Sequence, residues 1–243
     1  MTYVTLETQK TERVGLMTLR YGAENRFHPD FMAEIVETLG RAEGEKEIGA
    51  LVVTGGDPRF FSNGLDLEWI SGHIADMPAV LGYLRTMNSM YKRWTLYPKP
   101  VVAALNGHTF AGGLFMAAHM DFRFMREERG WACIPESDIN IPLLPGMIAI
   151  CRAVMTPQGF RQMYYTGKRV TGPEAMTYGF VDAVFPAHDL VPKAVEFAAA
   201  LAKKRPDTYA EMKRRIRSGI ARIIDEVDPD YFESTLAFPM AGA

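Results

Sequence analysis

Residues 101–113 read V-V-A-A-L-N-G-H-T-F-A-G-G, and this stretch indicates the fold more strongly than any other. Its first five residues are short and apolar, which is typical of a strand buried on both faces. Asn106-Gly107 ends that strand. The pair Gly112-Gly113 predicts the start of a helix that runs through Met120. A helix start carries backbone N–H groups without intrahelical partners, so this turn could hold an anion.

The same alternation of strand and helix extends towards the N-terminus. Residues 50–54, A-L-V-V-T, form a second run of the buried-strand type. Alternating residues at 4–7 and the apolar run at 14–19 predict a hairpin. The segment from Pro29 to Gly44 has the apolar spacing of an amphipathic helix, with proline in its first turn. We therefore expect an α/β core.

The last third of the chain, from about Met147, is expected to be mostly helical. Residues 171–174, T-G-P-E, have capping-box spacing and predict a short helix closed by Gly179, with a strand at 181–184 after it. The clearest later helices are expected at 190–204 and 206–227. We place a boundary near residue 190, which divides a core (residues 1–189) from a C-terminal helical region (residues 190–243).

Composition excludes several classes of protein. The 243 residues are 48 % apolar and 23 % charged, with a net charge of -2, so no overall field favours nucleic acid. No apolar run reaches the roughly 20 residues that span a bilayer, and the N-terminus has no leader pattern. The end, Met240–Ala243, is not a peroxisomal address. We expect a cytoplasmic protein with neither a membrane nor a nucleic-acid partner.

Ligation of a metal is not expected either. The five histidines are scattered, without the spacing H-E-x-x-H, and are interpreted as caps, surface or packing residues. Cys133 and Cys151 lack a metal or redox spacing and are interpreted as small packed residues. The chain has no phosphate-loop motif, no dinucleotide fingerprint and no G-x-S-x-G elbow.

A second glycine-bearing turn and one carboxylate point to a reaction. The turn is F-S-N-G-L-D-L at residues 61–67, and the carboxylate is Glu136, which follows Pro135. Removing a proton beside a thioester or ketone places negative charge on the carbonyl oxygen, which fixed backbone donors can stabilise. Two turns and one base supply what such an enolate needs. Taken alone, Glu136 would be interpreted as a solvent-facing side chain, and Gly112-Gly113 as tight strand–helix packing.

These residues resemble the crotonase (enoyl-CoA hydratase/isomerase) superfamily over nearly the whole chain. Within it, the chain is most similar to the monofunctional Δ3,Δ2-enoyl-CoA isomerases of the plant peroxisomal type. The resemblance is carried by stretches in a shared order and spacing: E-N-R-F-H-P-D at 24–30, F-F-S-N-G-L-D-L at 60–67, A-A-L-N-G-H at 103–108, D-F-R-F-M-R-E-E-R-G at 121–130 and P-E-S-D-I at 135–139.

The resemblance implies a spiral of ββα turns with C-terminal helices that form a homotrimer or a dimer of trimers. It implies an acyl-CoA substrate in fatty acid β-oxidation, and no separate cofactor, because coenzyme A is part of the substrate. It places the oxyanion hole at the N–H groups of Leu65 and Gly112, and catalysis at Glu136. Substrate contacts are expected from Ser62, Asn63, Gly64, Asp66, Gly113 and Phe115. For Asp66 we favour a structural role, in which it orients its turn through the backbone, and Asp138 is interpreted as a cap or a loop hydrogen bonder.

One position favours an isomerase over a hydratase. Family hydratases usually carry a second glutamate three residues after the position of Gly112, and here that residue is Phe115. A hydratase activates water between two carboxylates, whereas an isomerase needs one group that moves a proton from C2 to C4. We expect apolar neighbours such as Phe115 and Trp131 to raise the pKa of Glu136.

Two departures from the family pattern concern the acyl group. Asn140 stands where a glycine is common, and residues 142–146, P-L-L-P-G, differ from the usual hydratase cluster of glycines. Methionines such as Met147 either line an acyl tunnel or fill the core.

Several alternatives stay open. The chain could be a 2-enoyl-CoA hydratase whose second acid is Glu127 or Glu128, or a catalytically silent acyl-CoA-binding homologue. The basic residues at 203–205 and 213–217 are either a solvated helix face or a contact for the CoA phosphates.

Overall fold

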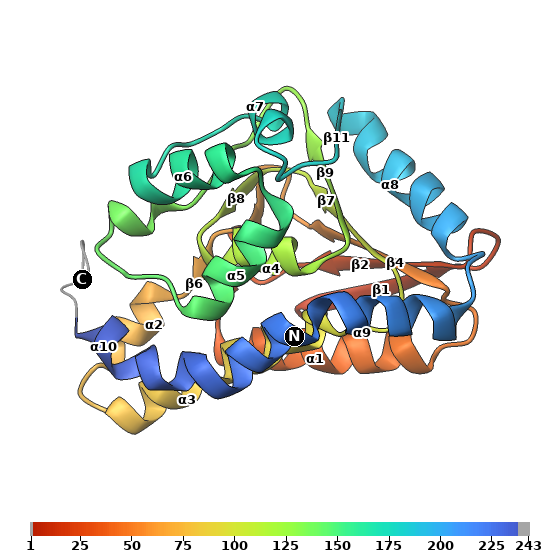
Figure 1. The fold of residues 1–243 in the computed structure, drawn as a ribbon. Coiled ribbons are helices and arrows are strands. Elements are labelled where there is room, and N and C mark those ends of the chain that lie inside the picture. The colour runs from red at the N-terminus through yellow and green to blue at the C-terminus, as the bar shows by residue number, and fades with distance from the viewer. Residues whose placement is uncertain (1, 238–243) are drawn as a thin grey trace.

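The computed structural model describes residues 2–237 (Figure 1). The strands are β1 (Val4–Gln9), β2 (Val14–Leu19), β3 (Arg26–Phe27), β4 (Ala50–Gly55), β5 (Phe60–Ser62), β6 (Gly64–Leu65), β7 (Val101–Leu105), β8 (His108–Phe110), β9 (Phe122–Arg126), β10 (Ala132–Cys133) and β11 (Ala183–Phe185). The α-helices are α1 (Pro29–Gly44), α2 (Leu67–Gly72), α3 (Met77–Thr95), α4 (Gly112–His119), α5 (Pro145–Val154), α6 (Pro157–Thr166), α7 (Gly172–Thr177), α8 (Ala187–Leu201), α9 (Pro206–Arg222) and α10 (Phe232–Leu236). Single turns of other helix types are η1 (Pro135–Ser137), η2 (Ile223–Val227) and η3 (Asp228–Tyr231). The prediction about Met240–Ala243 lies outside the described residues.

A six-stranded sheet with the order β1-β2-β4-β7-β9-β11 forms the centre of the molecule. The predicted hairpin is confirmed as the antiparallel pair β1–β2, and the remaining neighbours are parallel. Both runs expected to be buried strands, β4 and β7, are buried on both faces. In β4, Leu51 and Val53 face the main core, whereas Ala50 and Val52 pack under α8. This double burial is why the run is continuously apolar.

A second, three-stranded sheet has the order β10-β8-β5, and all its pairs are parallel. Successive segments of the chain supply one strand to each sheet: β4 then β5, β7 then β8, and β9 then β10. The chain therefore winds as a spiral of ββα-like turns. The carboxyl ends of the three short strands lie at one edge, where ligands bind in many parallel sheets.

Helices cover the sheet from two sides (Figure 1). Helix α8 lies along one face, with Leu190, Ala194 and Ala198 against the strands, and α1, α3 and α9 lie together on the other side of the molecule. Helix α1 has the predicted bounds. Because α8 spans the expected boundary near residue 190 and packs on the sheet, the division into two regions stays a prediction.

Helix α3 was not predicted from the sequence. Asp76 caps its start by accepting from the backbone N–H of Ala79 at 3.2 Å, and Pro78 occupies its first turn. Its buried residues recur at helical spacing: Val80, Tyr83, Leu84, Met87, Asn88, Met90, Tyr91, Trp94 and Thr95. The cap and the apolar period are signals that the sequence does contain.

The C-terminal third differs from prediction mainly in element ends. The capping box of α7 is confirmed, with Thr171 and Glu174 bonded reciprocally. The strand expected at 181–184 is β11, which begins two residues later and ends one residue later, because Ala183 to Phe185 pair with β9. The helix expected at 206–227 changes at residue 223 into the π-helical turn η2. Among residues 2–237, no helix is long and apolar enough to span a membrane.

Candidate active site

The three short parallel strands deliver the predicted site residues to one place. Strand β5 leads through Asn63 into β6, which ends at Leu65; β8 leads into α4, which begins at Gly112; and β10 leads into η1, which contains Glu136. These residues are separated by up to 71 positions in the sequence, yet Leu65, Gly112 and Glu136 all line one cavity.

The two glycine turns are in direct backbone contact. A Cβ atom placed on Gly64 would lie 2.3 Å from the backbone nitrogen of Gly112, and one on Gly113 would lie 2.3 Å from the carbonyl oxygen of Ser62. Neither position could carry a side chain without displacing the opposite turn. Gly64 also has a φ of 76°, in the left-handed region. Glycine at these positions is therefore what lets the two turns meet.

The backbone N–H of Gly112 is oriented by the residue before it. Ala111 has φ 49° and ψ −127°, the values of the first central residue in a type II′ turn, where glycine is usual. Its carbonyl oxygen accepts hydrogen bonds from the N–H groups of Leu114 at 2.9 Å and Phe115 at 3.1 Å. The C=O and N–H of one trans peptide unit point in opposite directions. The N–H of Gly112 therefore points away from helix α4, and no carbonyl of its own helix can reach it.

Leu65 belongs to the short pair β3–β6, in which it lies opposite Phe27. The next residue, Asp66, caps α2 by accepting from the backbone N–H of Trp69 at 3.1 Å. The carboxylate of Asp66 is thus used within the protein as a helix cap, and the orienting role expected of Asp66 in its turn stays a prediction.

Three neighbouring cavities surround Glu136. The narrowest, about 30 Å³, is lined by Leu65, Gly112 and Glu136 and otherwise by mostly apolar side chains: Leu84, Met87, Phe115, Ile141, Pro142, Leu143, Leu144, Met147 and Thr235. A cavity of about 350 Å³ shares Leu65, Glu136 and Ile141 with it and adds polar residues, including Arg26, Asn63 and Glu68. A third, of about 320 Å³, is lined by Glu136, Ser137, Asn140, Ile141, Pro142, Leu143, Tyr164 and Tyr165.

Glu136 is a buried acid that pairs with no cation among residues 2–237. Its residue surface is 6 % exposed, and its Oε2 atom has no hydrogen-bond partner among the described residues. Burial raises the pKa of Glu136 from 4.5 to about 8, against a smaller lowering by a backbone hydrogen bond. Perturbed carboxyl groups of this kind cluster at functional sites. Near neutral pH the group can both accept and return a proton.

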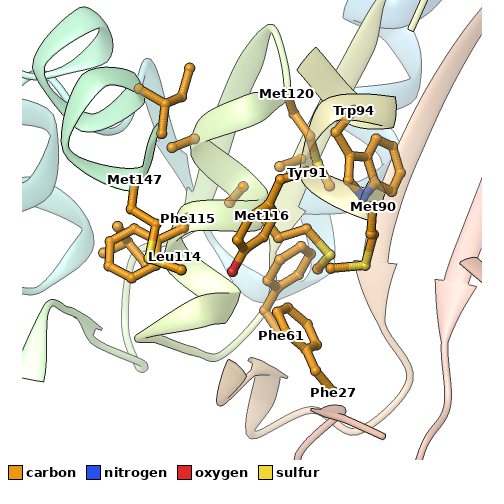
Figure 2. Packing of buried hydrophobic residues seen from close by; sticks show 14 of the residues in the cluster. Phe27, Phe61, Met90, Tyr91, Trp94, Leu114, Phe115, Met116, Met120 and Met147 are labelled. Carbon is orange, nitrogen blue, oxygen red and sulfur yellow. The ribbon is translucent and has the colours of Figure 1, made fainter. Parts of the chain in front are cut away.

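Of the two apolar neighbours expected for Glu136, one lines a cavity with it and the other does not. Phe115 is 1 % exposed and lines the narrow cavity with Glu136, within the core shown in Figure 2. Trp131 lines none of the three cavities; it is 41 % exposed, and its ring lies 5.1 Å from that of His108. The aliphatic residues Ile141 and Leu143 occupy the role expected of Trp131. Of the methionines, Met87 and Met147 line the cavity, whereas Met116 and Met120 fill the core (Figure 2).

The other predicted contact residues shape the turns. Asn63 lines the 350 Å³ cavity and donates from its Nδ2 to Glu24 at 3.1 Å. Ser62 is fully buried, donates to the carbonyl oxygen of Asn25 at 2.8 Å and accepts from the N–H of Gly64 at 3.1 Å. Ser62, Gly64, Asp66 and Gly113 line none of the three cavities.

The residues that depart from the family pattern have local explanations. Asn140 has a φ of 58°, so asparagine occupies a left-handed position that a glycine would also fit. Asp138 is exposed and ends η1, where its backbone N–H bonds to the carbonyl oxygen of Pro135 at 2.8 Å. Among the described residues, the carboxylate of Asp138 has no hydrogen-bond partner, so its expected role as a cap or a loop hydrogen bonder stays a prediction.

Helix α9 turns part of its basic cluster inwards, which neither interpretation of the sequence expected. Lys213 is 5 % exposed and binds Asp121 at 2.6 Å, and Arg217 donates to the carbonyl oxygens of His119 and Met120. These two cations stabilise the C-terminal end of α4 and are not free to bind a phosphate. The remaining residues, 203–205 with Arg214 and Arg215, are exposed.

The two proposed second acids lie elsewhere. Glu127 and Glu128 are exposed and line none of the three cavities, and Glu128 accepts from the backbone N–H of Ala187 and from Arg126. Glu68 does line the 350 Å³ cavity, but it is paired with Arg26 at 2.9 Å, and its side chain is 85 % exposed. Within the part of the chain that the structure describes, no cluster of residues could hold a metal ion, and both cysteines are buried and free.

Two tyrosines of α3 contact the site but are not among the residues predicted from the sequence. Tyr83 accepts from the backbone N–H of Asp66 at 3.0 Å, and Tyr91 donates to the carbonyl oxygen of Gly112 at 3.0 Å. Both are buried, at 2 % and 1 % exposure. Their spacing on an amphipathic helix is a signal that predicts burial in the core. It does not predict which backbone groups their hydroxyls bind, because those groups are distant in the sequence.

Comparisons with known proteins agree with this fold. A family model described as enoyl-CoA hydratase/isomerase matches residues 9–228. The chain is 33 % identical to enoyl-CoA delta isomerase 3 of Arabidopsis thaliana, covering 89 % of this chain and 94 % of that protein. It is 32 % identical to the peroxisomal enoyl-CoA delta isomerase 2 of the same plant, covering 89 % and 93 %. The crystal structure of human mitochondrial delta3-delta2-enoyl-CoA isomerase superposes with a TM-score of 0.90 at 22 % identity, over 97 % of this chain and 92 % of that one. The structural likeness confirms the expected spiral fold with its C-terminal helices.

Proposed function

Because the chain belongs to the enoyl-CoA hydratase/isomerase family, we propose that it moves a double bond from C3 to C2 of an acyl-CoA thioester. One observation carries the proposal. Among the described residues, Glu136 is the only acid that lines the cavity it shares with Leu65 and Gly112. A single buried carboxylate beside two candidate backbone donors suits a proton transfer within one substrate.

In the proposed reaction, the thioester oxygen accepts hydrogen bonds from the N–H groups of Leu65 and Gly112. Ionised Glu136 removes a proton from C2, and the electron pair of that C–H bond delocalises into a dienolate. The negative charge rests largely on the thioester oxygen, where each donor contributes about 3 kcal/mol to the transition state. The protonated carboxyl then delivers its proton to C4, which leaves the double bond between C2 and C3. The same carboxyl group acts first as base and then as acid. The proton removed from C2 is returned at C4, so the substrate gains and loses no atoms.

The pKa of Glu136 supports this double role. General catalysis is most efficient when the pKa of the group lies near the working pH. A pKa of about 8, raised by burial, makes the carboxylate a stronger base than an exposed glutamate and its conjugate acid a usable donor. The apolar cavity around it also excludes water from the dienolate.

The side chain at position 115 supports isomerisation over hydration. Phe115 fills space beside Glu136 with an aromatic ring, so that wall of the cavity offers no second carboxylate to activate water. Glu127 and Glu128, the alternatives considered from the sequence, are exposed and outside the cavities.

A panel of 3-enoyl-CoA and 2-enoyl-CoA esters, followed by NMR in D2O, tests the proposal. We expect 3-enoyl esters to give 2-trans-enoyl esters, with proton exchange confined to C2 and C4. Rapid formation of a 3-hydroxyacyl ester from crotonyl-CoA would instead establish a hydratase. A protein that binds the esters without exchange at either carbon would be a silent acyl-CoA-binding homologue.

We also propose that the protein works as a homotrimer or a dimer of trimers. Helix α9 supports this with two apolar side chains on its outer face, Met212 at 65 % and Ile216 at 78 % exposure. Sedimentation equilibrium tests the assembly, and replacement of both residues by glutamate should then lower its mass. A monomer at all concentrations would contradict it.

A further inference from the structure

Helix α3 touches both glycine turns through hydroxyl groups. The hydroxyl of Tyr83 accepts from the backbone N–H of Asp66, and the hydroxyl of Tyr91 donates to the carbonyl oxygen of Gly112. Both distances are 3.0 Å, and both side chains are buried. A buried tyrosine hydroxyl normally finds a partner, but here both partners are the main chain beside a proposed donor.

On the Leu65 side, the peptide units on each side of the donor are held. The donor N–H belongs to the peptide unit between Gly64 and Leu65. The unit before it is held because the N–H of Gly64 bonds to the hydroxyl of Ser62 at 3.1 Å. The unit after it is held because the N–H of Asp66 bonds to Tyr83. With both neighbours fixed, the donor peptide has little freedom to rotate.

On the Gly112 side, the donor peptide unit is itself held by the first turn of α4, through the carbonyl oxygen of Ala111. The following unit is held by Tyr91, which binds the carbonyl oxygen of Gly112. Glycine lacks the Cβ that would restrict rotation at this position, so an external contact matters more here. The ring of Tyr91 packs against two other rings: its centroid lies 6.3 Å from that of Phe27 and 5.0 Å from that of His119. Figure 2 shows Tyr91 within this packed core.

The two hydroxyls belong to one rigid element. Tyr83 and Tyr91 are eight residues apart on α3, about 12 Å along its axis, and both lie on its buried face. A single helix therefore contacts both turns, in addition to the direct contact between their backbones. Catalysis by backbone donors depends on such fixed geometry, because a donor that must reorient loses much of its advantage.

We propose that Tyr83 and Tyr91 are positioning residues that hold the two N–H groups of the oxyanion hole at a fixed separation; this rests on the function proposed above. Neither tyrosine gives or takes a proton in the reaction. Each acts through the peptide unit next to the donor.

The test compares Tyr83→Phe and Tyr91→Phe with Tyr97→Phe in the full-length protein. Tyr97 is the matched control, because it is fully buried just after α3 and its hydroxyl has no partner among the described residues. Two readouts are measured: kcat and KM with a 3-enoyl-CoA, and the carbonyl vibrational band of bound 2-enoyl-CoA labelled with ¹³C at C1. The second readout reports polarisation of the thioester oxygen without requiring turnover.

We expect Tyr83→Phe and Tyr91→Phe each to lower kcat about tenfold with KM changed less than about twofold, because the donors act mainly on the transition state. The carbonyl band should shift towards that of the unbound ester in both variants. Tyr97→Phe should leave both readouts unchanged. If all three variants match the unmodified protein in band position and kcat, the inference is wrong.

The vibrational readout separates this inference from the proposed function. A protein that never isomerises 3-enoyl esters but loses carbonyl polarisation in the two variants would sink the proposed function and keep the positioning role. Thermal unfolding of each variant identifies loss of folding. If one variant fails to fold, the other tests the same claim on the opposite donor.

Discussion

The two ends of helix α4 differ in how fully the polar groups beside them are hydrogen-bonded or ion-paired. At its C-terminal end, the carbonyl oxygen of Met120 accepts from Arg123 at 2.9 Å and from Arg217 at 3.1 Å. Beside it, Asp121 binds Lys213 at 2.6 Å and lies 3.5 Å from Arg217. At its N-terminal end, Ala111 holds a left-handed φ, and Glu136, which lines the same cavity as Gly112, is buried with an oxygen that has no partner in the part of the chain that the structure describes.

This difference separates a structural carboxylate from a candidate catalytic one. The side chain of Asp121 is 9 % exposed, and its charge is compensated by Lys213, as stability requires. Glu136 is buried, but no cation among the described residues pairs with it, and such uncompensated burial costs free energy. Strain and unsatisfied groups of this kind persist where the surrounding structure imposes them, which is common at functional sites. The N-terminal end of α4 is therefore the place to look for chemistry.

The largest expected effect is the loss of turnover in Glu136→Gln. The amide keeps the shape of the side chain but cannot accept the C2 proton, so we expect kcat for 3-enoyl-CoA to fall about 10³-fold. The free energy of unfolding should stay equal or rise, because a buried acid without a cation is removed. Steady-state kinetics and urea unfolding measure the two quantities. Near-normal turnover in this variant would remove Glu136 from the mechanism.

Asp121→Asn should produce the reverse pattern. It leaves Lys213 buried without its anion, and breaking a buried pair in this way costs about 3–5 kcal/mol of unfolding free energy. Turnover per folded molecule should stay within about threefold. The double variant Asp121→Asn with Lys213→Met is the matched control and should recover much of the stability. A stable Asp121→Asn protein without activity would contradict the comparison.

The pH dependence of stability should reveal the same contrast. Burial raises the pKa of Glu136 from 4.5 to about 8. Between these values the folded state binds more protons than the unfolded state. The contribution of this group to stability is therefore greatest below pH 4.5 and is lost as the pH rises to about 8, by up to about 1.4 kcal/mol per pH unit.

Urea unfolding at several pH values, with Glu136→Gln as the reference, isolates this contribution. The difference between the two proteins should narrow towards low pH and be largest near pH 8. For turnover, the ionised base is required, so kcat/KM should rise about tenfold per pH unit below 8 and level off above it. Parallel stability curves for the two proteins would mean that Glu136 ionises normally.

The smallest expected effect concerns the strained turn. Ala111→Gly relieves a φ of 49° and should raise the free energy of unfolding by up to about 1 kcal/mol, after the entropy cost of the added glycine. Ala117→Gly, in the buried interior of the same helix, is the matched control and should lower it by about 1 kcal/mol. Thermal unfolding compares the two. Equal destabilisation by both changes would show that Ala111 carries no strain.

The elements with clear local signals could be predicted. Pro29–Gly44 was predicted with its observed bounds because proline, apolar period and stop signal coincide. The start of α4 was found from Gly112-Gly113 after a buried strand, and the start of α7 from its capping-box spacing. Helix α3 was missed although its cap and period are present, and β11 was misplaced because its ends are set by pairing with β9 rather than by its own residues.

The candidate site was predicted in part. The two turns and Glu136 were found from residue types and their order, and the structure brings them to one cavity. The contribution expected of Trp131 is instead made by aliphatic residues, and the inward turn of Lys213 and Arg217 was not expected. Neither the exposure of Trp131 nor the burial of Lys213 and Arg217 could be predicted from neighbouring residues in the sequence, because the direction of a long side chain depends on what packs against its segment.

The sequence by itself determined where strands end and where glycine turns begin, because these follow from φ preferences and the spacing of apolar residues. Only the tertiary structure decided that Leu65, Gly112 and Glu136 share a cavity, that the acid is left without a cation, and that Tyr83 and Tyr91 hold the turns. Distance and burial are set by the packing of segments far apart in the chain, and no local pattern encodes them.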